Sequence, residues 1–499
     1  MSELSGSTLP PLPLVLWKTP PGLELILAQE GVPFEIARDP HPLAFRVGRF
    51  VLYDGRAESA SALRGLLTHE HVAIDVDGLR GGESVDPFEA LVDDREVRAT
   101  WDVRGCELRE RVARRPKAWI RRRLVAALRN AVAAQGGVWM RLASFPHPFR
   151  SAFNLRVDLD EPAADDYHRF GMARNLLADC CTHFVSTKAY QDEPEVLSDL
   201  RRYDTQSHGH YHYVYRDGEA NRKNLLRAER ILNRNGFDVE GFAAPHGRWN
   251  AALDDALESM GYLYSSDFRI GYDDLPFFPW KNGRFSRVLQ VPVHPICEGL
   301  FMDAGVSDAR FIGDYLASVV KEKIAAGEPA FVYGHPERRL GRMPEVMFAL
   351  ARTLKSRPLV WRTTLTEMAR WWRWRADRKW LVIAREGGRF DVQFDEWSAE
   401  YPLALEIDRA GFRCSIPITS ARTVLNLQHL VYERRSEPVD RVVRPPAIDR
   451  RPSSFRQMVR EAIDWETETP IDELTGGTLA VRVKKSLRWW KRRRTGTHS

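Results

Sequence analysis

The residues of this chain best suited to chemistry are two carboxylates and a group of histidines in two short stretches. Asp158 and Asp160 stand two apart in RVDLDEP, which continues the alternating, β-prone run FNLRV. Side chains two apart on a strand point to the same side, so both carboxylates would face one cavity. About fifty residues later, in SHGHYH, His208 and His212 bracket a glycine-containing turn, with His210 between them.

These residue types favour metal-assisted hydrolysis. Two imidazoles and one carboxylate are a sufficient ligand set for a divalent ion that keeps an open coordination position. The remaining carboxylate can act as general base toward the water that the metal activates. An amide is a poor electrophile with a poor leaving group, so it benefits both from a polarising metal and from an imidazole that protonates the departing nitrogen.

The two stretches lie in a region, residues 150–375, where strand-like and helix-like segments alternate. The candidate strands are FNLRVDLD, THFVST, DTQSHGH, FDVEGFAAP, YLYSSDF, RVLQVPVHP and PAFVYGHP. Strands separated by helices predict parallel βαβ units, and about seven of them close a barrel or near-barrel. In such folds the chemistry gathers at the C-terminal ends of the strands. The residues that fall at these ends are Asp160, His208, Pro245, His294 and His335.

The flanking parts of the chain follow other patterns. Residues 1–107 read as a small α/β domain, and residues 108–149 as a basic, mostly helical connector. Short alternating runs in 376–435, LQHLVYERR among them, predict a small β domain. Residues 436–499 hold a Pro/Arg linker, a short helix and a basic tail with tryptophans. The predicted fold class is therefore α/β, a distorted (β/α) barrel of about seven strands with an N-terminal α/β domain and a small C-terminal β domain.

Charge is unevenly distributed along the 499 residues. The formal net charge is +6, but the last twenty-one residues carry eight Lys or Arg and no Asp or Glu, so the rest of the chain is close to neutral. This excludes a surface that coats nucleic acid. The tail, SLRWWKRRR, reads either as an interfacial anchor on anionic lipid or as a basic end without a partner. Arg121–Arg123, beside Trp119, likewise suit phosphate or lipid headgroups, or else a solvated helix.

Several sequence features indicate a cytoplasmic protein. The first residues lack the basic and apolar regions of a secretory signal, and no run of eighteen apolar residues occurs. The five cysteines are scattered, without a CxxC motif, as expected for reduced thiols. We expect a cytoplasmic location, with peripheral membrane contact through the tail as one interpretation.

Five segments occur in a familiar order: RVDLDEP, SHGHYH, FAAPHGRWN, SSDFRIGYDDLPFFPW and VYGHPERR. In these segments the chain resembles the polysaccharide deacetylase family, the NodB-homology type of carbohydrate esterase. The resemblance implies a distorted (β/α) barrel and a metal, usually zinc, held by one aspartate and two histidines. Carried over, it makes Asp160, His208 and His212 the metal ligands, Asp158 the general base, and His335 the acid that protonates the leaving amine.

The chain departs from the family pattern at two places. The aspartates are usually adjacent and precede Gly-Pro, whereas here Leu159 separates them, a form similar to the branch that acts on lipid-linked aminoarabinose. The third segment usually carries an arginine that orients the base, and Ala243 stands there instead. Arg248 and Arg156 are the two candidates to replace it.

A further set of residues is placed around the substrate. Aromatic residues beside Asp267 suggest a groove wall on which a sugar stacks, and ordinary packing is the alternative for them. The predicted substrate-binding residues are His246, Arg248, Asp267, Trp280 and His294.

The sequence thus predicts a metal-dependent hydrolase, with one divalent ion for which zinc is favoured, that removes an acetyl or formyl group from an amino sugar. A lipid- or nucleotide-linked precursor is favoured over a polymer because no export signal is found. Two alternatives remain: a degenerate barrel that binds a glycan or a partner without turnover, and a metal hydrolase of another C–N bond, such as a cyclic amide.

Overall fold

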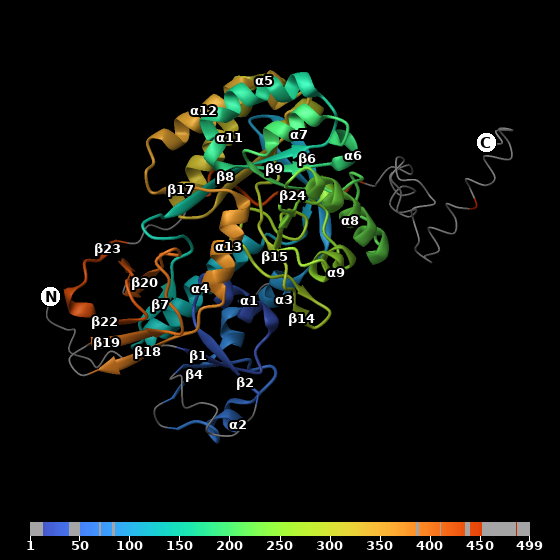
Figure 1. Cartoon of the computed structure of the whole chain (residues 1–499). Helices are drawn as coiled ribbons and strands as arrows, with labels where there is room; N and C mark the ends of the chain where they lie inside the picture. Colours follow the sequence, from blue (N-terminus) through green and yellow to red (C-terminus); the bar gives the residue numbers. More distant parts are fainter. Residues whose placement is uncertain are drawn as a thin grey trace.

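The computed structural model describes residues 13–38, 50–68, 71–81, 85–385, 389–409, 411–434, 440–451 and Ser486. Its centre is a curled parallel sheet in the order β15-β12-β11-β10-β9-β8-β16, with β17 paired to the start of β8 (Figure 1). The strands are β8 (Ser151–Leu159), β9 (Cys181–Val185), β10 (Asp204–Ser207), β11 (Gly241–Phe242), β12 (Tyr264–Ser265), β15 (Leu289–Gln290), β16 (Ala330–Gly334) and β17 (Val360–Arg362). All seven predicted strands are confirmed, and with them the distorted barrel.

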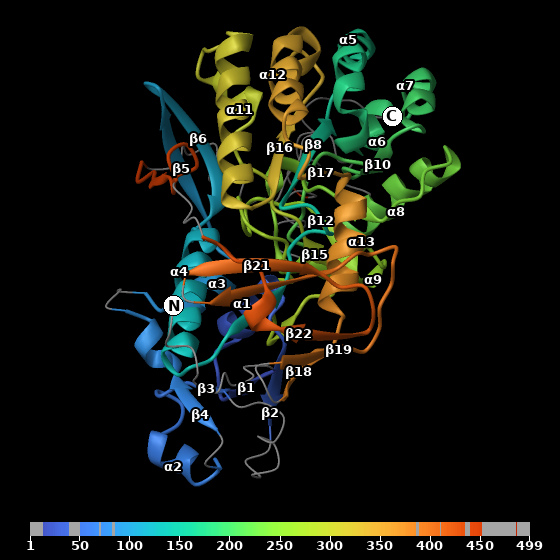
Figure 2. The same ribbon diagram turned by 90° about the vertical axis from the view of Figure 1, so that its left-hand side faces the viewer.

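Helices connect these strands and cover the outer face of the sheet, as parallel pairing requires. They are α5 (Ala164–Arg174), α6 (Thr187–Tyr190), α7 (Pro194–Leu200), α8 (Gly218–Arg234), α9 (Ala251–Ser259), α10 (Glu298–Asp303), α11 (Ala309–Ala326), α12 (Pro344–Lys355) and α13 (Leu365–Ala376). In Figure 2 α5, α11 and α12 stand side by side, whereas α13 runs down toward the terminal domains. A short hairpin, β13 (Trp280–Lys281) with β14 (Arg284–Phe285), follows β12.

The N-terminal residues form a second parallel sheet in the order β2-β1-β3-β4. Its elements are β1 (Leu14–Trp17), α1 (Pro21–Glu30), β2 (Phe34–Ala37), β3 (Phe50–Tyr53), α2 (Ala60–Arg64), β4 (Val72–Asp75) and α3 (Pro87–Val92). Helix α1 begins directly after Pro20 and ends at Gly31, whose φ of 67° suits a residue without Cβ. The α/β character predicted for this region is therefore present.

The mostly helical connector predicted for residues 108–149 is wrong in its first part. Residues Cys106–Ala113 form β6, which pairs antiparallel with β5 (Glu96–Val103), and β24 (Ala447–Ile448) extends that sheet. Leu108 and Val112 are buried on one side of β6, a period of two that the intervening charged residues obscure. Helix α4 (Lys117–Ala134) begins only after Pro116.

The C-terminal β region consists of two antiparallel sheets. One contains β18 (Trp380–Arg385), β19 (Arg389–Phe394) and β22 (Arg422–Asn426). The other has the order β23-β21-β20-β7 and contains β20 (Ala404–Arg409), β21 (Phe412–Pro417), β23 (Glu433–Arg434) and β7 (Trp139–Leu142). Strand β7 comes from the segment before the barrel. The strand predicted in LQHLVYERR is confirmed only near its end, where Glu433–Arg434 forms β23. Its first part is wrong, because Leu427–His429 is a single 3-10 turn capped by Asn426.

One arginine network joins the three parts of the chain. Arg121, on α4, is 4% exposed and pairs with Glu30 of the N-terminal domain and with Asp274 and Glu328 of the barrel. Glu30 also pairs with Arg141, whose second partner is a carboxylate on β20. Arg121 is therefore a buried residue that links the N-terminal domain to the barrel through ion pairs. This corrects the interpretation of Arg121 as a contact for phosphate or lipid.

Lys117, at the start of α4, is buried with its ammonium group over the ring of Phe277. Burial lowers the pKa of Lys117 to about 8. The unfolded chain binds this proton up to a higher pH, so stability rises between pH 8 and the usual lysine pKa near 10.5. We expect Lys117→Met to stabilise the protein at neutral pH by at most ~3 kcal/mol, measured by denaturant unfolding. The gain should vanish near pH 10.5, and a gain independent of pH would contradict this account.

Within the described ranges, no helix is long and apolar enough to cross a membrane. The basic tail and the short helix predicted before it lie outside the described residues, apart from Ser486.

Candidate active site

The predicted catalytic residues meet where the parallel strands end. Asp158 lies in β8, and Asp160 directly follows the strand. Because β9 and β16 flank β8 and run in the same direction, residues just after all these strands come to one edge. His208 follows β10, and His335 follows β16.

Asp160, His208 and His212 converge on one point. Their closest atoms, Asp160 Oδ1 and the two histidine Nε2 atoms, are 3.1–3.2 Å apart in all three pairs. Tetrahedral zinc ligands, at about 2.0–2.1 Å from the ion, are separated from one another by roughly 3.3 Å. The three atoms therefore have the spacing of one face of a metal tetrahedron.

The hydrogen-bonding state of these three side chains also favours a bound cation. His208 Nδ1 lies 2.7 Å from the carbonyl oxygen of Ala243, which can only accept, so Nδ1 carries the hydrogen and Nε2 presents a lone pair. Asp160 Oδ1 is buried and, in the described part of the chain, has no hydrogen-bond partner. A divalent ion satisfies this set, and Asp160, His208 and His212 are the residues that fit it. The side chains of Asp160 and His212 are 21% and 23% exposed, so the site opens to solvent.

The loop that carries the histidines is held from behind by α8. Asn224 Oδ1 accepts from the backbone N–H groups of His210 and Tyr211, and its amide donates to the Tyr211 carbonyl. Gly209 has φ 85°, and a Cβ there would lie 3.0 Å from the Asn224 amide. His210 is buried, with its Nδ1 3.0 Å from the Thr187 hydroxyl, and so supports the loop while its neighbours form the site.

Asp158 is held by Arg156, two residues earlier on the same strand. The guanidinium donates to both carboxylate oxygens, at 2.7 and 2.6 Å, and lies between the rings of Phe184 and Tyr333. Burial, the largest single influence, would raise the pKa of Asp158, but the charge and hydrogen bonds of Arg156, together with the charges of His208 and His335, outweigh it and the pKa is lowered. Arg248 instead points to the Tyr213 hydroxyl and the Val214 carbonyl. Of the two candidate replacements for the arginine absent at 243, Arg156 is the one that contacts Asp158.

His335 reaches the same cavity, with its Nε2 3.6 Å from Asp160 Oδ2. Its Nδ1 is 2.9 Å from Glu298 Oε1, which also accepts from the His335 backbone N–H. Burial opposes the charged imidazole, but hydrogen bonds to Cys297 and Glu298 raise the pKa of His335 well above its usual value. Cys297, Glu298 and His335 form a second group of metal-type donors. The guanidinium of Arg339, 2.7 Å from the Nδ1, already supplies a cation to that group.

The predicted substrate residues divide into two sets. His246 is exposed, with its ring 4.8 Å from that of His212, whereas Trp280 is half-buried against Phe285. In the buried set, Asp267 accepts from the Ala244 N–H and the Ser265 hydroxyl, so both of its oxygens are engaged.

His294, the other buried residue, has its Nδ1 3.0 Å from Asp273 and its Nε2 3.0 Å from the Tyr315 hydroxyl. These contacts make Asp267 and His294 parts of the framework, and a role toward the substrate stays a prediction for them too. For His246, Arg248 and Trp280 the substrate role stays a prediction.

Two residues near the site were missed by the sequence reading. Glu298 lies in PICEGL, which shows no periodicity or motif to distinguish it. Glu337, two residues after His335, is 5% exposed and accepts from the Tyr190 hydroxyl. Burial raises the pKa of Glu337 to about 8, and among the described residues its Oε2 has no partner. A second carboxyl so close to His335 in VYGHPE was the available signal.

Comparison with solved structures found partial likenesses. A putative polysaccharide deacetylase from Mycobacterium smegmatis is 19% identical over 46% of this chain and 92% of that chain, with a TM-score of 0.39. A probable polysaccharide deacetylase from Pseudomonas aeruginosa PAO1 is 21% identical over 45% of this chain and 92% of that chain, with a TM-score of 0.37. A CE4 family pseudoenzyme from Bacillus anthracis shares 13% over 45% of this chain and 68% of its own, with a TM-score of 0.31.

No protein-family model and no curated protein matches the chain. The sequence motifs and the solved structures thus both show a resemblance to polysaccharide deacetylases, which covers about half of the chain. What this barrel does is inferred below from its own side chains.

Proposed function

We propose that this protein is a metal-dependent hydrolase that removes an acetyl or formyl group from the nitrogen of an amino sugar. The observation that carries the proposal is the convergence of three lone pairs, from Asp160, His208 and His212, beside a carboxylate and an imidazole that can exchange protons. Zinc is the ion we favour, because one carboxylate and two imidazoles in tetrahedral spacing suit it.

The chemistry follows from the side chains of the site. A divalent ion held there would lower the pKa of a water and polarise the amide carbonyl. Asp158 takes the proton from the attacking water, and each of its oxygens keeps a second lone pair beside the one bound by Arg156. Arg156 also keeps Asp158 ionised, so the base is available from mildly acidic pH upward.

His335 delivers a proton to the departing nitrogen. Glu298 lies 2.9 Å from its Nδ1 and favours the charged imidazolium, the form that a general acid needs. Arg339 offsets the negative charge that Glu298 brings into the buried site. The cavity thus has a base and an acid at separate positions, as amide cleavage requires.

The proposed substrate is a lipid- or nucleotide-linked glycan precursor in the cytoplasm. The absence of the orienting arginine at 243 is the feature that favours a degenerate barrel. The Arg156–Asp158 contact weakens that alternative, because another arginine holds the base. Hydrolysis of a different C–N bond remains the competing chemistry.

The test is hydrolysis by the zinc-loaded protein. We would incubate it with N-acetyl and N-formyl amino sugars in free, nucleotide-linked and polyprenyl-phosphate-linked form, and measure released acetate or formate and the new primary amine. Release from any of them, abolished by Asp158→Asn, is the expected result. Ring opening of a cyclic amide without acyl release, or no reaction with any acylated sugar, would overturn the proposal.

Arg156→Lys keeps the charge but loses the two-pronged contact with Asp158. We expect kcat to fall about tenfold to a hundredfold with little change in KM, because the base and not the substrate loses its position. The acidic limb of the pH–rate profile should move to higher pH, since Arg156 lowers the pKa of Asp158. Arg169→Lys, the same change on the exposed face of α5, is the control. An unchanged profile in Arg156→Lys would contradict this role.

A further inference from the structure

A basic cleft lies beside the loop that carries the metal ligands. It has a volume of about 660 Å³ and runs along the outer face of α8, with Gln191, just past α6, among the residues that line it. Figure 1 shows α6 and α8 next to one another at this edge of the barrel. The cations that line the cleft are Arg222, Lys223, Arg227, Arg230 and Arg234. None of the described residues lining it is Asp or Glu.

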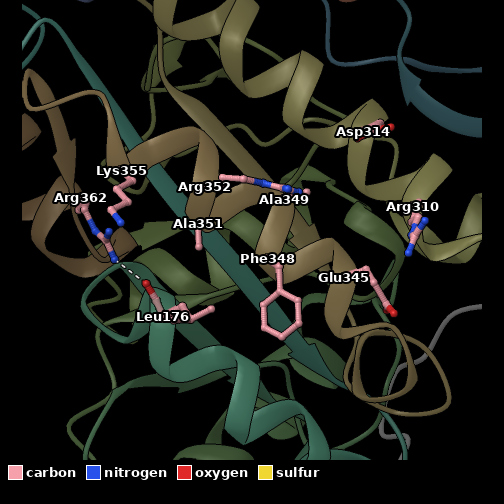
Figure 3. A pocket seen from close by; sticks show the side chains of 10 residues that line it. All are labelled: Leu176, Arg310, Asp314, Glu345, Phe348, Ala349, Ala351, Arg352, Lys355 and Arg362. Carbon is pink, nitrogen blue, oxygen red and sulfur yellow. Dashed lines mark hydrogen bonds between the residues drawn. The ribbon is translucent and has the colours of Figure 1, made fainter.

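A groove elsewhere on the barrel gives a useful contrast. It lies between α11, α12 and the 3-10 helix Asn175–Cys180, with Phe348 near its centre (Figure 3). Its four cations are interspersed with Asp314 and Glu345, and Arg362 is bonded to the Leu176 carbonyl. Mixed charge of this kind is what an ordinary solvated surface shows. The cleft at α8 carries one sign of charge only.

The spacing of the cations along α8 concentrates that charge. Lys223, Arg227, Arg230 and Arg234 follow one another at intervals of four, three and four residues, so they form one stripe on the helix. Like charges at these intervals repel and disfavour the helix unless an anion lies between them. Among the described residues, no ion pair involves Arg230 or Arg234, and Glu219, at the start of α8, pairs with Arg222.

The cleft shares its wall with the metal site. Tyr211, which lines the cleft, directly precedes the ligand His212, and its hydroxyl accepts from Arg227 at 3.1 Å. Lys188 and Arg227 lie 5.3 and 5.8 Å from the centre of the Tyr211 ring. Asn224, whose side chain holds the metal-ligand loop, also lines the cleft. An anion bound here would therefore be separated from the proposed metal site by the loop that carries His208 and His212.

We propose that this cleft binds the phosphate or diphosphate group through which the sugar is attached to its carrier. Guanidinium groups match phosphate oxygens with two parallel hydrogen bonds, and several of them along one face suit a phosphate chain. The inference rests on the proposed function, because it assigns the carrier end of the same substrate. A nucleoside diphosphate and a polyprenyl phosphate share this chemistry.

The test measures binding without turnover. The full-length, zinc-loaded protein is titrated with uridine diphosphate by calorimetry, and with phosphatidylcholine vesicles that contain a polyprenyl phosphate by sedimentation. We expect the variant Lys223→Gln/Arg230→Gln/Arg234→Gln to weaken binding of at least one probe by about tenfold or more. Arg310→Gln/Arg352→Gln/Lys355→Gln, in the groove of Figure 3, removes the same charge and should bind within about twofold of wild type. All variants keep the metal ligands, so any contact of the probe with the ion is common to them.

The probe that loses affinity identifies the carrier. Selective loss for uridine diphosphate indicates a nucleotide carrier, and selective loss for the polyprenyl phosphate indicates a lipid carrier. Equal binding to vesicles of phosphatidylcholine with phosphatidylglycerol would show a general membrane surface and overturn the proposal, as would wild-type affinity of the cleft variant for every probe. If the cleft variant loses binding but the wild-type protein hydrolyses no acylated sugar, the cleft is still an anion-binding site and the proposed reaction is rejected.

Discussion

Protein carrying His208→Ala and His212→Ala will retain no tightly bound divalent ion, whereas the wild-type chain will hold about one equivalent. The two substitutions remove two of the three lone pairs that converge at 3.1–3.2 Å, and Asp160 alone is an ordinary partly exposed carboxylate. Metal content is measured by atomic emission after purification and after incubation with zinc. Acyl release, where the wild type shows it, should fall by more than about a thousandfold.

A matched control keeps the number of histidines equal. His168→Ala/His429→Ala removes two exposed imidazoles from α5 and from the C-terminal β region, and should leave both metal content and melting temperature unchanged. Chelation should lower the melting temperature of the wild type and of this control, but not of the His208/His212 variant, because only a folded site binds the ion. A wild-type protein that takes up no metal, or a variant that takes up as much, would refute the metal site.

The part of the site that sequence could predict is the part set by strand ends. Asp160, His208 and His335 each follow a short apolar strand, and parallel strands bring such positions together whatever the loops do. The period of two in RVDLDEP likewise placed Asp158 and Asp160 on one side. These features are local, so a single sequence contains them.

The features that the sequence could not predict depend on contacts between distant segments, or on an apolar period that charged residues obscure. The choice between Arg156 and Arg248 as partner of Asp158 is decided by the packing of Arg156 between Phe184 and Tyr333, which come from two other strands. Glu298 reaches His335 from a segment without any motif. The sequence of strand β6 favours a helix because its charged residues hide the buried positions Leu108 and Val112, which have a period of two.

Arg121→Met should destabilise the protein by about 3–5 kcal/mol, the usual effect of removing one member of a buried ion network. The guanidinium is 4% exposed and is the only cation that pairs with Asp274 among the described residues, at 2.8 Å. Glu30 and Glu328 keep Arg141 and Lys323, so the cost falls mainly on Asp274. Denaturant unfolding followed by circular dichroism measures the loss, taken from the first transition because a chain of several parts need not unfold in one step.

Two companion variants separate this account from a general effect of altering α4. Arg122→Met, one residue further along, removes an arginine that is 19% exposed and pairs with Asp440 and, at 3.7 Å, with Glu328. Because Glu328 keeps Lys323 and Asp440 is itself partly exposed, this variant should cost less than Arg121→Met. Arg121→Met/Asp274→Leu should recover much of the stability, because no uncompensated charge then remains buried. A double variant as unstable as Arg121→Met alone would mean that Arg121 acts through Glu30 and Glu328 instead. In that case Arg121 would stabilise the protein by linking the N-terminal domain to the barrel, and not by neutralising the buried Asp274.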